Sequence, residues 1–102
     1  MIFLVGPMGS GKSTVGRALA ARLGTNLVDL DELVAAGAGL SIPEIFEAEG
    51  EAGFRDREQA ALADIADLRG PLVVATGGGA VLREANRRRM AEAGRVVYLH
   101  AP

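Results

Sequence analysis

The segment at residues 6–13 constrains the fold of this chain more strongly than any other feature. It reads Gly-Pro-Met-Gly-Ser-Gly-Lys-Ser and so fits the pattern G-x-x-x-x-G-K-[ST]. A short apolar run at residues 2–5 precedes it, and a helical pattern at about residues 12–23 follows it, closed by Gly24. In a strand–loop–helix unit of this kind, successive backbone N–H groups and the positive end of the helix face a phosphate group. The sequence therefore predicts a loop that binds the phosphates of a nucleotide.

Strand and helix patterns alternate along the rest of the chain. Short apolar runs predict strands at residues 2–5, 27–30, 72–75 and 96–99. Periodic or capped segments predict helices at residues 12–23, 31–36, 41–46, 54–69 and 84–93. This alternation is typical of a mostly parallel sheet with helices on both faces. We therefore expect a single domain over residues 1–102, with the three-layer α/β fold of P-loop nucleoside-triphosphate hydrolases.

Local patterns make sharper predictions within these elements. Ser41 and Glu44 have the spacing of a capping box, which predicts a helix start. Gly50 and Gly53 are expected to loosen the chain before the longer helix. Long side chains in the first helix recur at three-and-four spacing, at Val15, Leu19, Arg22 and Leu23.

Composition and charge narrow the classes of partner. The formal net charge is -2, which leaves no overall basic footprint for nucleic acid. The run Arg87-Arg88-Arg89 lies in a helical pattern, where a solvated face is the simplest interpretation. There is no cysteine, which fits a reducing cytoplasm, and no apolar run has the length of a membrane span. We therefore expect a cytoplasmic protein that binds neither nucleic acid nor membrane.

Two acidic residues lie at the end of the second predicted strand. Asp29 and Asp31 stand two apart, so both carboxylates project from one side if the strand geometry continues to Asp31. One could hold Mg²⁺ through water, next to a Ser13 hydroxyl ligand, while the other accepts a hydrogen bond from a substrate hydroxyl. The alternative is that Asp caps the next helix.

An arginine and a glycine run complete the candidate site. Arg55 precedes Glu58 by three residues and Gln59 by four, which are positions from which a side chain can hold its guanidinium. A guanidinium held in this way can bind a carboxylate through two hydrogen bonds, although a surface ion pair is the commoner arrangement. Residues 77–79 are three glycines directly after a buried strand, which favours a loop that faces a ligand over a plain turn.

In order and spacing, these features resemble the shikimate kinases. The resemblance rests on residues 6–13 with Thr14, Asp29-Leu-Asp31, Ile45-Phe46, Gly50-Glu51, Phe54-Arg55 and Thr76 to Gly79. It implies transfer of a phosphoryl group from ATP, with Mg²⁺, to a hydroxyl of shikimate. The product would be shikimate 3-phosphate, an intermediate in chorismate and aromatic amino-acid synthesis. The alternatives are another small-molecule kinase, for gluconate or a nucleoside monophosphate, or a nucleotide-binding module without catalysis.

The resemblance also implies a role for each matching residue. Lys12 would contact the transferring phosphate, and Asp31 would bind the hydroxyl that is phosphorylated. Ser13 and Asp29 would serve Mg²⁺. The implied nucleotide-binding residues are Gly9, Ser10, Gly11, Lys12, Ser13 and Thr14. The implied substrate-binding residues are Asp31, Phe46, Phe54, Arg55, Gly77, Gly78 and Gly79, with Arg55 on the shikimate carboxylate.

Shikimate kinases continue past the fourth strand into an arginine-bearing lid and a final strand and helix, whereas the sequence here ends at Pro102. We therefore expect a sheet that is incomplete at its C-terminus. Transfer is expected to be slow or absent without the lid. The strand at residues 96–99 is expected to lie at an open edge, where a second chain could pair with it.

Overall fold

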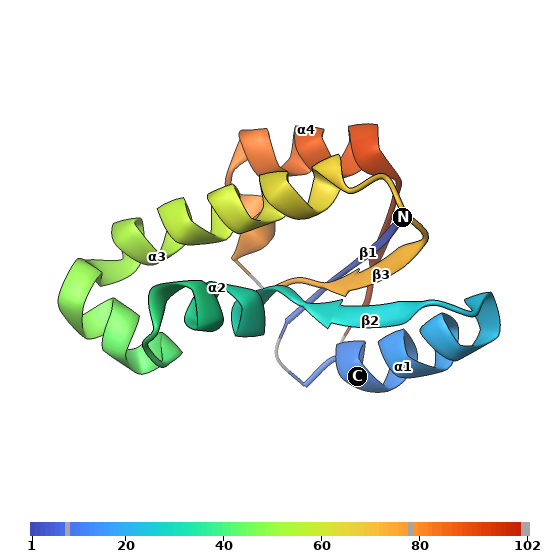
Figure 1. Ribbon diagram of the computed structural model, residues 1–102, viewed down its shortest axis with the longest axis horizontal. Helices are drawn as coiled ribbons and strands as arrows, with labels where there is room; N and C mark the ends of the chain where they lie inside the picture. Colours follow the sequence, from blue (N-terminus) through green and yellow to red (C-terminus); the bar gives the residue numbers. More distant parts are fainter. Residues whose placement is uncertain (8, 78, 101–102) are drawn as a thin grey trace.

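A computed structural model describes residues 1–7, 9–77 and 79–100. Its sheet has four parallel strands in the spatial order β2-β3-β1-β4 (Figure 1). The strands are β1 (Ile2–Val5), β2 (Asn26–Asp29), β3 (Leu72–Ala75) and β4 (Arg95–Tyr98). The predicted strands at 2–5 and 72–75 are confirmed, and the other two begin and end one residue earlier than predicted. Because β3 lies between β1 and β2, the chain crosses over β3 on its way from β1 to β2.

Helices cover both faces of this sheet, which confirms the predicted three-layer α/β fold (Figure 1). Helix α1 (Lys12–Leu23) lies on one face, and α3 (Ile42–Asp67) and α4 (Glu84–Ala93) lie side by side on the other. Helix α2 (Leu30–Ala38) packs with the first half of α3 beyond the sheet. A single 3₁₀ turn, η1 (Ala80–Leu82), connects the glycine run to α4. None of the described helices has the length and apolarity needed to cross a membrane.

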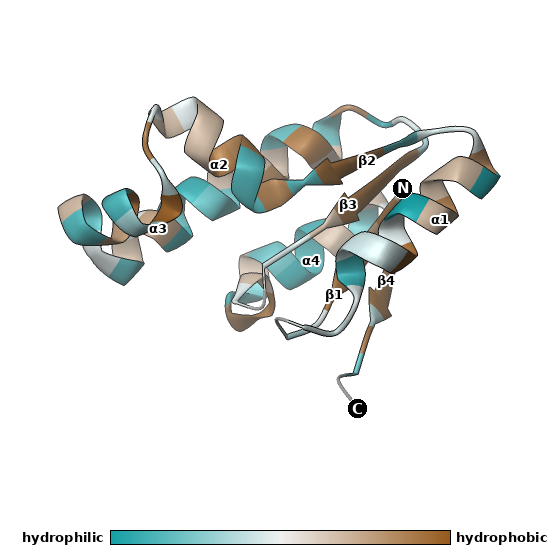
Figure 2. Cartoon of the chain, turned by 90° about the horizontal axis from the view of Figure 1, so that it is seen from below, coloured by the Kyte–Doolittle hydropathy of each residue, from teal (hydrophilic) through white to brown (hydrophobic). Residues whose placement is uncertain are grey.

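The core follows the two-residue alternation of the strands. Figure 2 shows the strands largely in the hydrophobic colour, while α3 and α4 carry many hydrophilic positions. On the face covered by α3 and α4, the buried cluster is Phe3, Val5, Leu30, Leu62, Ile65, Val74 and Met90. On the face covered by α1, it is Leu4, Ala20 and Val73. Neighbouring residues of β1 and β3 therefore pack into opposite layers, as expected for strands buried on both faces.

The packed face of α1 agrees with the predicted stripe only at Leu19, which packs against the core. Val15 is 41% exposed and Leu23 is 52% exposed, whereas the buried positions of the helix are Gly16 and Ala20. A Cβ atom on Gly16 would lie 2.7 Å from Leu27 Cδ1. The helix thus approaches the sheet through its small residues, and the larger apolar side chains remain partly in solvent.

The start of α3 confirms the predicted capping box. Ser41 N donates to Glu44 Oε1, and Glu44 N donates to Ser41 Oγ. The two helices expected around Gly50 are joined into one long element, which bends at Gly50 (φ 74°, ψ -179°). Arg57 binds both oxygens of the Glu49 carboxylate at 2.7 Å and so connects the two sides of the bend. The bend brings the Phe46 side of the helix towards Phe54.

Gly94, between α4 and β4, offers a test of this packing. Its φ of 177° is open to any residue, but a Cβ there would lie 1.9 Å from the Met1 carbonyl oxygen. That oxygen also accepts a hydrogen bond from Arg95 N at 2.9 Å, so it cannot move without disturbing the β1–β4 pairing. We expect Gly94→Ala to lower the free energy of unfolding by about 1–3 kcal/mol in urea denaturation. Gly37→Ala, with no atom within 4 Å of the added methyl, is the control and should not destabilise the protein; equal losses would contradict this packing.

Candidate functional site

The carboxyl ends of β1, β2 and β3 open onto one cleft of about 370 Å³. Ligands of parallel α/β sheets bind at this side, beyond the strand ends. The cleft is lined by Gly9, Ser10, Gly11, Lys12, Ser13, Thr14, Asp29, Asp31, Ala75, Thr76 and Gly77. The structure thus brings together the predicted phosphate loop, the acidic pair and the start of the glycine run. Of the predicted site residues, Gly78 lies outside the described residues.

The phosphate loop owes its shape to two glycines. Gly9 (φ 82°) and Gly11 (φ 86°) adopt left-handed backbone, which other residues rarely tolerate. Gly11 is also the N-cap of α1 and offers no side chain to the free N–H groups of the first helical turn. No acidic side chain lies in that turn either. The helix therefore leaves its first N–H groups and its positive end free to bind an anion.

Lys12 lies at the mouth of this loop. Its ammonium donates to the Gly6 carbonyl and, at 3.3 Å, to the Pro7 carbonyl. It is the only lysine in the sequence. Lys12 lines the same cleft as Ser13 and Asp31.

The acidic pair does not have the predicted geometry. Strand β2 ends at Asp29 and α2 begins at Leu30, so Asp31 lies in the first helical turn. Asp29 Oδ1 accepts hydrogen bonds from Asp31 N at 2.9 Å and Glu32 N at 3.2 Å, which confirms the capping alternative for Asp29. Both carboxylates nevertheless line the cleft. Asp29 reaches it from the end of β2 and Asp31 from the first turn of α2, instead of both projecting from one strand.

Asp31 is in an environment that disfavours its charge. Burial raises its pKa, the neighbouring Asp29 carboxylate raises it further, and the Arg55 and Lys12 cations oppose this. Asp31 Oδ1 is buried and has no hydrogen-bond partner among the described residues. A carboxylate with a free buried oxygen is well suited to accept a hydrogen bond from a hydroxyl group.

Arg55 is held mainly by Glu58. Its Nη1 lies 3.3 Å from Glu58 Oε1, and the Glu58 side chain is only 1% exposed. A second carboxylate, Glu51, lies 3.7 Å from Nε and is exposed. The simple surface-pair alternative is therefore wrong, since the main partner is buried. The predicted contact with Gln59 is not formed either; Gln59 accepts from Arg83 at 2.9 Å instead.

The two described glycines of the run, Gly77 and Gly79, lie next to Asp31 and Arg55 respectively. A Cβ on Gly77 would lie 3.1 Å from both Asp31 carboxylate oxygens and 3.3 Å from Glu58 Oε2. A Cβ on Gly79 would lie 2.2 Å from Arg55 Cζ. The glycines are thus required for a close approach of backbone to charged side chains. Thr76, the residue before the run, fixes its start because its hydroxyl and its N–H both donate to the Leu4 carbonyl at 3.0 Å.

The two phenylalanines lie next to Arg55. The rings of Phe46 and Phe54 stack with centroids 4.8 Å apart, and Arg55 Cζ lies 5.1 Å from the Phe54 centroid. Phe54 is 3% exposed and Phe46 is 38% exposed, so Phe46 has the more surface to offer a ligand. The structure thus brings the predicted ring-binding residues to the guanidinium.

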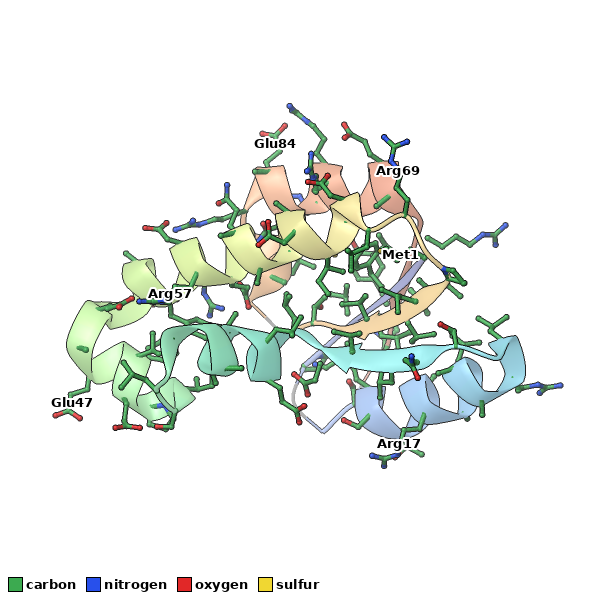
Figure 3. All side chains as sticks on the ribbon, in the orientation of Figure 1. Met1, Arg17, Glu47, Arg57, Arg69 and Glu84 are labelled. Carbon is green, nitrogen blue, oxygen red and sulfur yellow. The ribbon has the colours of Figure 1, made fainter. Side chains whose placement is uncertain are left out.

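A second, larger cleft of about 600 Å³ lies at the opposite end of the sheet. Met1, Arg69 and Pro71 contribute to its lining, and Figure 3 labels the first two at that end. It contains none of the predicted site residues and lies away from the carboxyl ends of the strands, where ligands of such sheets bind. We therefore assign the site to the smaller cleft.

The burial of Glu58 has a consequence for stability. Burial raises the pKa of Glu58 from its ordinary value of 4.5, and the opposing effect of Arg55 is smaller. The folded protein therefore retains this proton at a pH where the unfolded chain has lost it. The contribution of Glu58 to stability is fully present below pH 4.5 and is lost as pH rises through the raised pKa.

We expect the difference in unfolding free energy, wild type minus Glu58→Gln, to fall as pH rises from 4.5 to 7. Glutamine matches the shape of Glu58 but does not titrate, so taking the difference removes the contribution of the other carboxylates. Urea denaturation of both proteins across this range measures it. A difference that grows with pH would mean that the pairing with Arg55 outweighs burial.

The parallel sheet, with the loop of residues 6–13 between β1 and α1, defines the chain as a protein of the α/β class with a P-loop fold. Its sequence and fold then identify the family. The shikimate kinase family model matches residues 8–102. A shikimate kinase from Pseudomonas putida is 56% identical over 100 residues, which cover 98% of this chain and 58% of that protein. The chain therefore belongs to the shikimate kinase family.

Solved structures agree with this assignment. The shikimate kinase from Acinetobacter baumannii in complex with shikimate has a TM-score of 0.94 and 50% sequence identity, covering 99% of this chain and 56% of that chain. A gluconokinase from Sinorhizobium meliloti has a TM-score of 0.57 and 25% identity, covering 99% of this chain and 57% of that chain. The chain spans 58% of the length of the Pseudomonas putida relative. It resembles the shikimate kinase much more closely than the gluconokinase.

Proposed function

We propose that this protein transfers the terminal phosphoryl group of ATP to a hydroxyl of shikimate, giving shikimate 3-phosphate. The observation that carries the proposal is the shared cleft, in which the phosphate loop and Asp31 line the same space. A phosphate on Lys12 and a hydroxyl on Asp31 would be neighbours there. The family and the shikimate complex of the Acinetobacter baumannii enzyme support shikimate as the substrate.

The nucleotide side of the proposal uses the loop and the first turn of α1. Backbone N–H groups of Gly9, Ser10, Gly11, Ser13 and Thr14 would bind the phosphates. Lys12 would give up its hydrogen bonds to the Gly6 and Pro7 carbonyls and donate to the transferring phosphate instead. The ammonium would then offset negative charge that develops in the transition state.

The residues in the cleft also fit Mg²⁺. This ion prefers one or two protein oxygens together with phosphate oxygens and water, and Ser13 and Asp29 offer a hydroxyl and a carboxylate in the same cleft. Over residues 1–7, 9–77 and 79–100, no three His, Cys, Asp or Glu side chains form a metal-binding cluster. A dedicated all-protein cage is therefore not the mode that these residues offer. When bound, Mg²⁺ would neutralise phosphate charge.

The substrate side begins at Asp31 and ends at Arg55. Asp31 would accept a hydrogen bond from the attacking hydroxyl through its free oxygen. Arg55, braced by Glu58, would bind the shikimate carboxylate through two hydrogen bonds, and Phe46 and Phe54 would contact the ring. Gly77, Gly78 and Gly79 would offer N–H groups between these two ends. Because phosphoryl transfer has a loose transition state, Asp31 acts mainly by orienting the hydroxyl and then takes up its proton.

Release of ADP tests this proposal against its alternatives. Purified protein with ATP and Mg²⁺ is assayed with shikimate, gluconate or a nucleoside monophosphate as acceptor, while calorimetry measures ATP binding. We expect any ADP release above the background with ATP alone to be slow and to occur only with shikimate. Release with gluconate would favour the gluconate kinase alternative, and ATP binding without release for any acceptor would favour a non-catalytic nucleotide-binding module.

We further propose a cytoplasmic location and self-association through β4. The absence of cysteine fits a reducing compartment.

Strand β4 lies at one edge of the described sheet, where Val97 is 38% exposed and Tyr98 is 57% exposed. Such an edge can pair with the same edge of another copy. Light scattering after size exclusion should show a mass that rises with concentration, and a constant monomer mass would refute self-association.

A further inference from the structure

Helix α4 buries a polar side chain on the face that packs against the core. Its buried residues are Asn86 and Met90, one turn apart, and Asn86 is only 2% exposed. Met90 packs in the main hydrophobic cluster. A buried amide is costly unless it forms hydrogen bonds, so its presence calls for a specific partner.

That partner is the carbonyl group that follows the glycine run. Asn86 Nδ2 donates to the Ala80 carbonyl at 3.0 Å, and Ala80 itself is fully buried. Ala80 N donates to the Gly77 carbonyl at 3.1 Å. Ala80 is thus held on both sides, by Asn86 through its carbonyl and by Gly77 through its N–H. The Leu82 N–H closes the turn by donating to the Gly79 carbonyl, also at 3.1 Å.

The same turn of α4 connects this anchor to α3. The Arg83 carbonyl accepts hydrogen bonds from Asn86 N at 3.1 Å and from Arg87 N at 3.2 Å. The Arg83 side chain binds Asp56 at 2.8 Å and Gln59 at 2.9 Å, both on α3. These α3 residues flank Glu58 and follow Arg55. One hydrogen-bonded path therefore connects the glycine run with the helix that carries the guanidinium.

We infer that Asn86 is a positioning residue that sets the distance between the glycine run and Arg55, and through it the affinity for an acid that carries hydroxyl groups. The guanidinium packs directly against Gly79, so a shift of the run changes where both groups meet a ligand. The inference rests on the proposed function, since shikimate is the ligand meant. Asn86 does not line the cleft and would act only through the position of the run.

Asn86→Leu tests the inference, because leucine keeps the volume but cannot donate to the Ala80 carbonyl. We expect about tenfold weaker shikimate binding in calorimetry, with ATP binding unchanged. In NMR spectra of the free protein, the amide resonances of Gly77, Gly79 and Ala80 should move. If this variant fails to fold, Asn86→Asp keeps the shape and supplies a carboxylate that cannot donate at pH 7, and it should give the same two results.

Met90→Ala is the matched control, since it damages the same helix face one turn away from the run. Each protein is measured at the same number of degrees below its own melting temperature. Under these conditions, Met90→Ala should leave the glycine resonances and the shikimate affinity near those of the wild type. Unchanged glycine resonances in Asn86→Leu, or unchanged shikimate affinity where the wild type binds shikimate, would overturn the inference. A wild-type protein that does not bind shikimate would refute the proposed function instead, and the glycine resonances would still decide the role of Asn86.

Discussion

Lys12→Met is expected to weaken ATP binding by about 10- to 100-fold and to reduce phosphoryl transfer by about 1000-fold or more. The side chain is the only lysine of the chain and lies at the mouth of the phosphate loop. Methionine preserves most of its length and apolar stem but has no charge. The loss in transfer should exceed the loss in binding, because the transition state places more charge opposite the ammonium than the ground state does.

Arg17→Met is the control for Lys12. Arg17 lies on the outer surface of α1 and its side chain points into solvent (Figure 3). The variant removes the same charge from the same helix, so it should change ATP binding little. Titration with a fluorescent ATP analogue measures both variants. Equal losses in the two would show that net charge, and not the position of Lys12 at the loop, determines nucleotide affinity.

Gly79→Ala is expected to weaken shikimate binding by about 10- to 100-fold, close to the effect of Arg55→Ala, while changing unfolding free energy by less than about 1 kcal/mol. Gly79 has φ -84° and ψ -6°, which alanine adopts without strain. The added methyl would lie 2.2 Å from Arg55 Cζ, so the guanidinium must leave its position. The far end of a flexible side chain can move at little cost to folding, but the geometry for a carboxylate is then lost.

Calorimetric titration with shikimate and with ATP separates this effect from a general loss of structure. ATP affinity should be retained in both Gly79→Ala and Arg55→Ala, because neither residue lines the phosphate loop. Gly37→Ala introduces the same change where no atom lies within 4 Å of the added methyl, and it should bind shikimate like the wild type. A Gly79→Ala variant with full shikimate affinity would refute the assignment of Arg55 to the substrate.

The fold was largely predictable because its signals are local. The apolar runs and the capping box at Ser41 each lie within a few residues. The structure places the strands within one residue of the predicted runs and confirms the capping box. The packed face of α1 was not predictable in the same way. Hydrophobic spacing pointed to Val15 and Leu23, but the close approach of helix and sheet selected Gly16 and Ala20. Small residues at a helix contact leave no signal in apolar spacing, so only the three-dimensional approach reveals them.

The site was predictable as a set of residues but not as a geometry. Asp29 and Asp31 line the cleft, yet α2 begins at Leu30 and turns Asp29 into its cap. The i, i+3 spacing from Arg55 pointed to Glu58 but could not show that the carboxylate is buried. Asn86 gave no local signal, because a single polar residue in a polar helix looks like surface. Each of these features depends on a contact between elements far apart in the sequence.

In the proposed function, one cleft brings ATP phosphates and shikimate together. The most direct test is a calorimetric titration of the protein with shikimate, followed by the same titration with gluconate. We expect binding of one shikimate per chain, weakened about 10- to 100-fold in Arg55→Ala, and no measurable binding of gluconate. Absence of shikimate binding, or gluconate binding of equal strength, would contradict it.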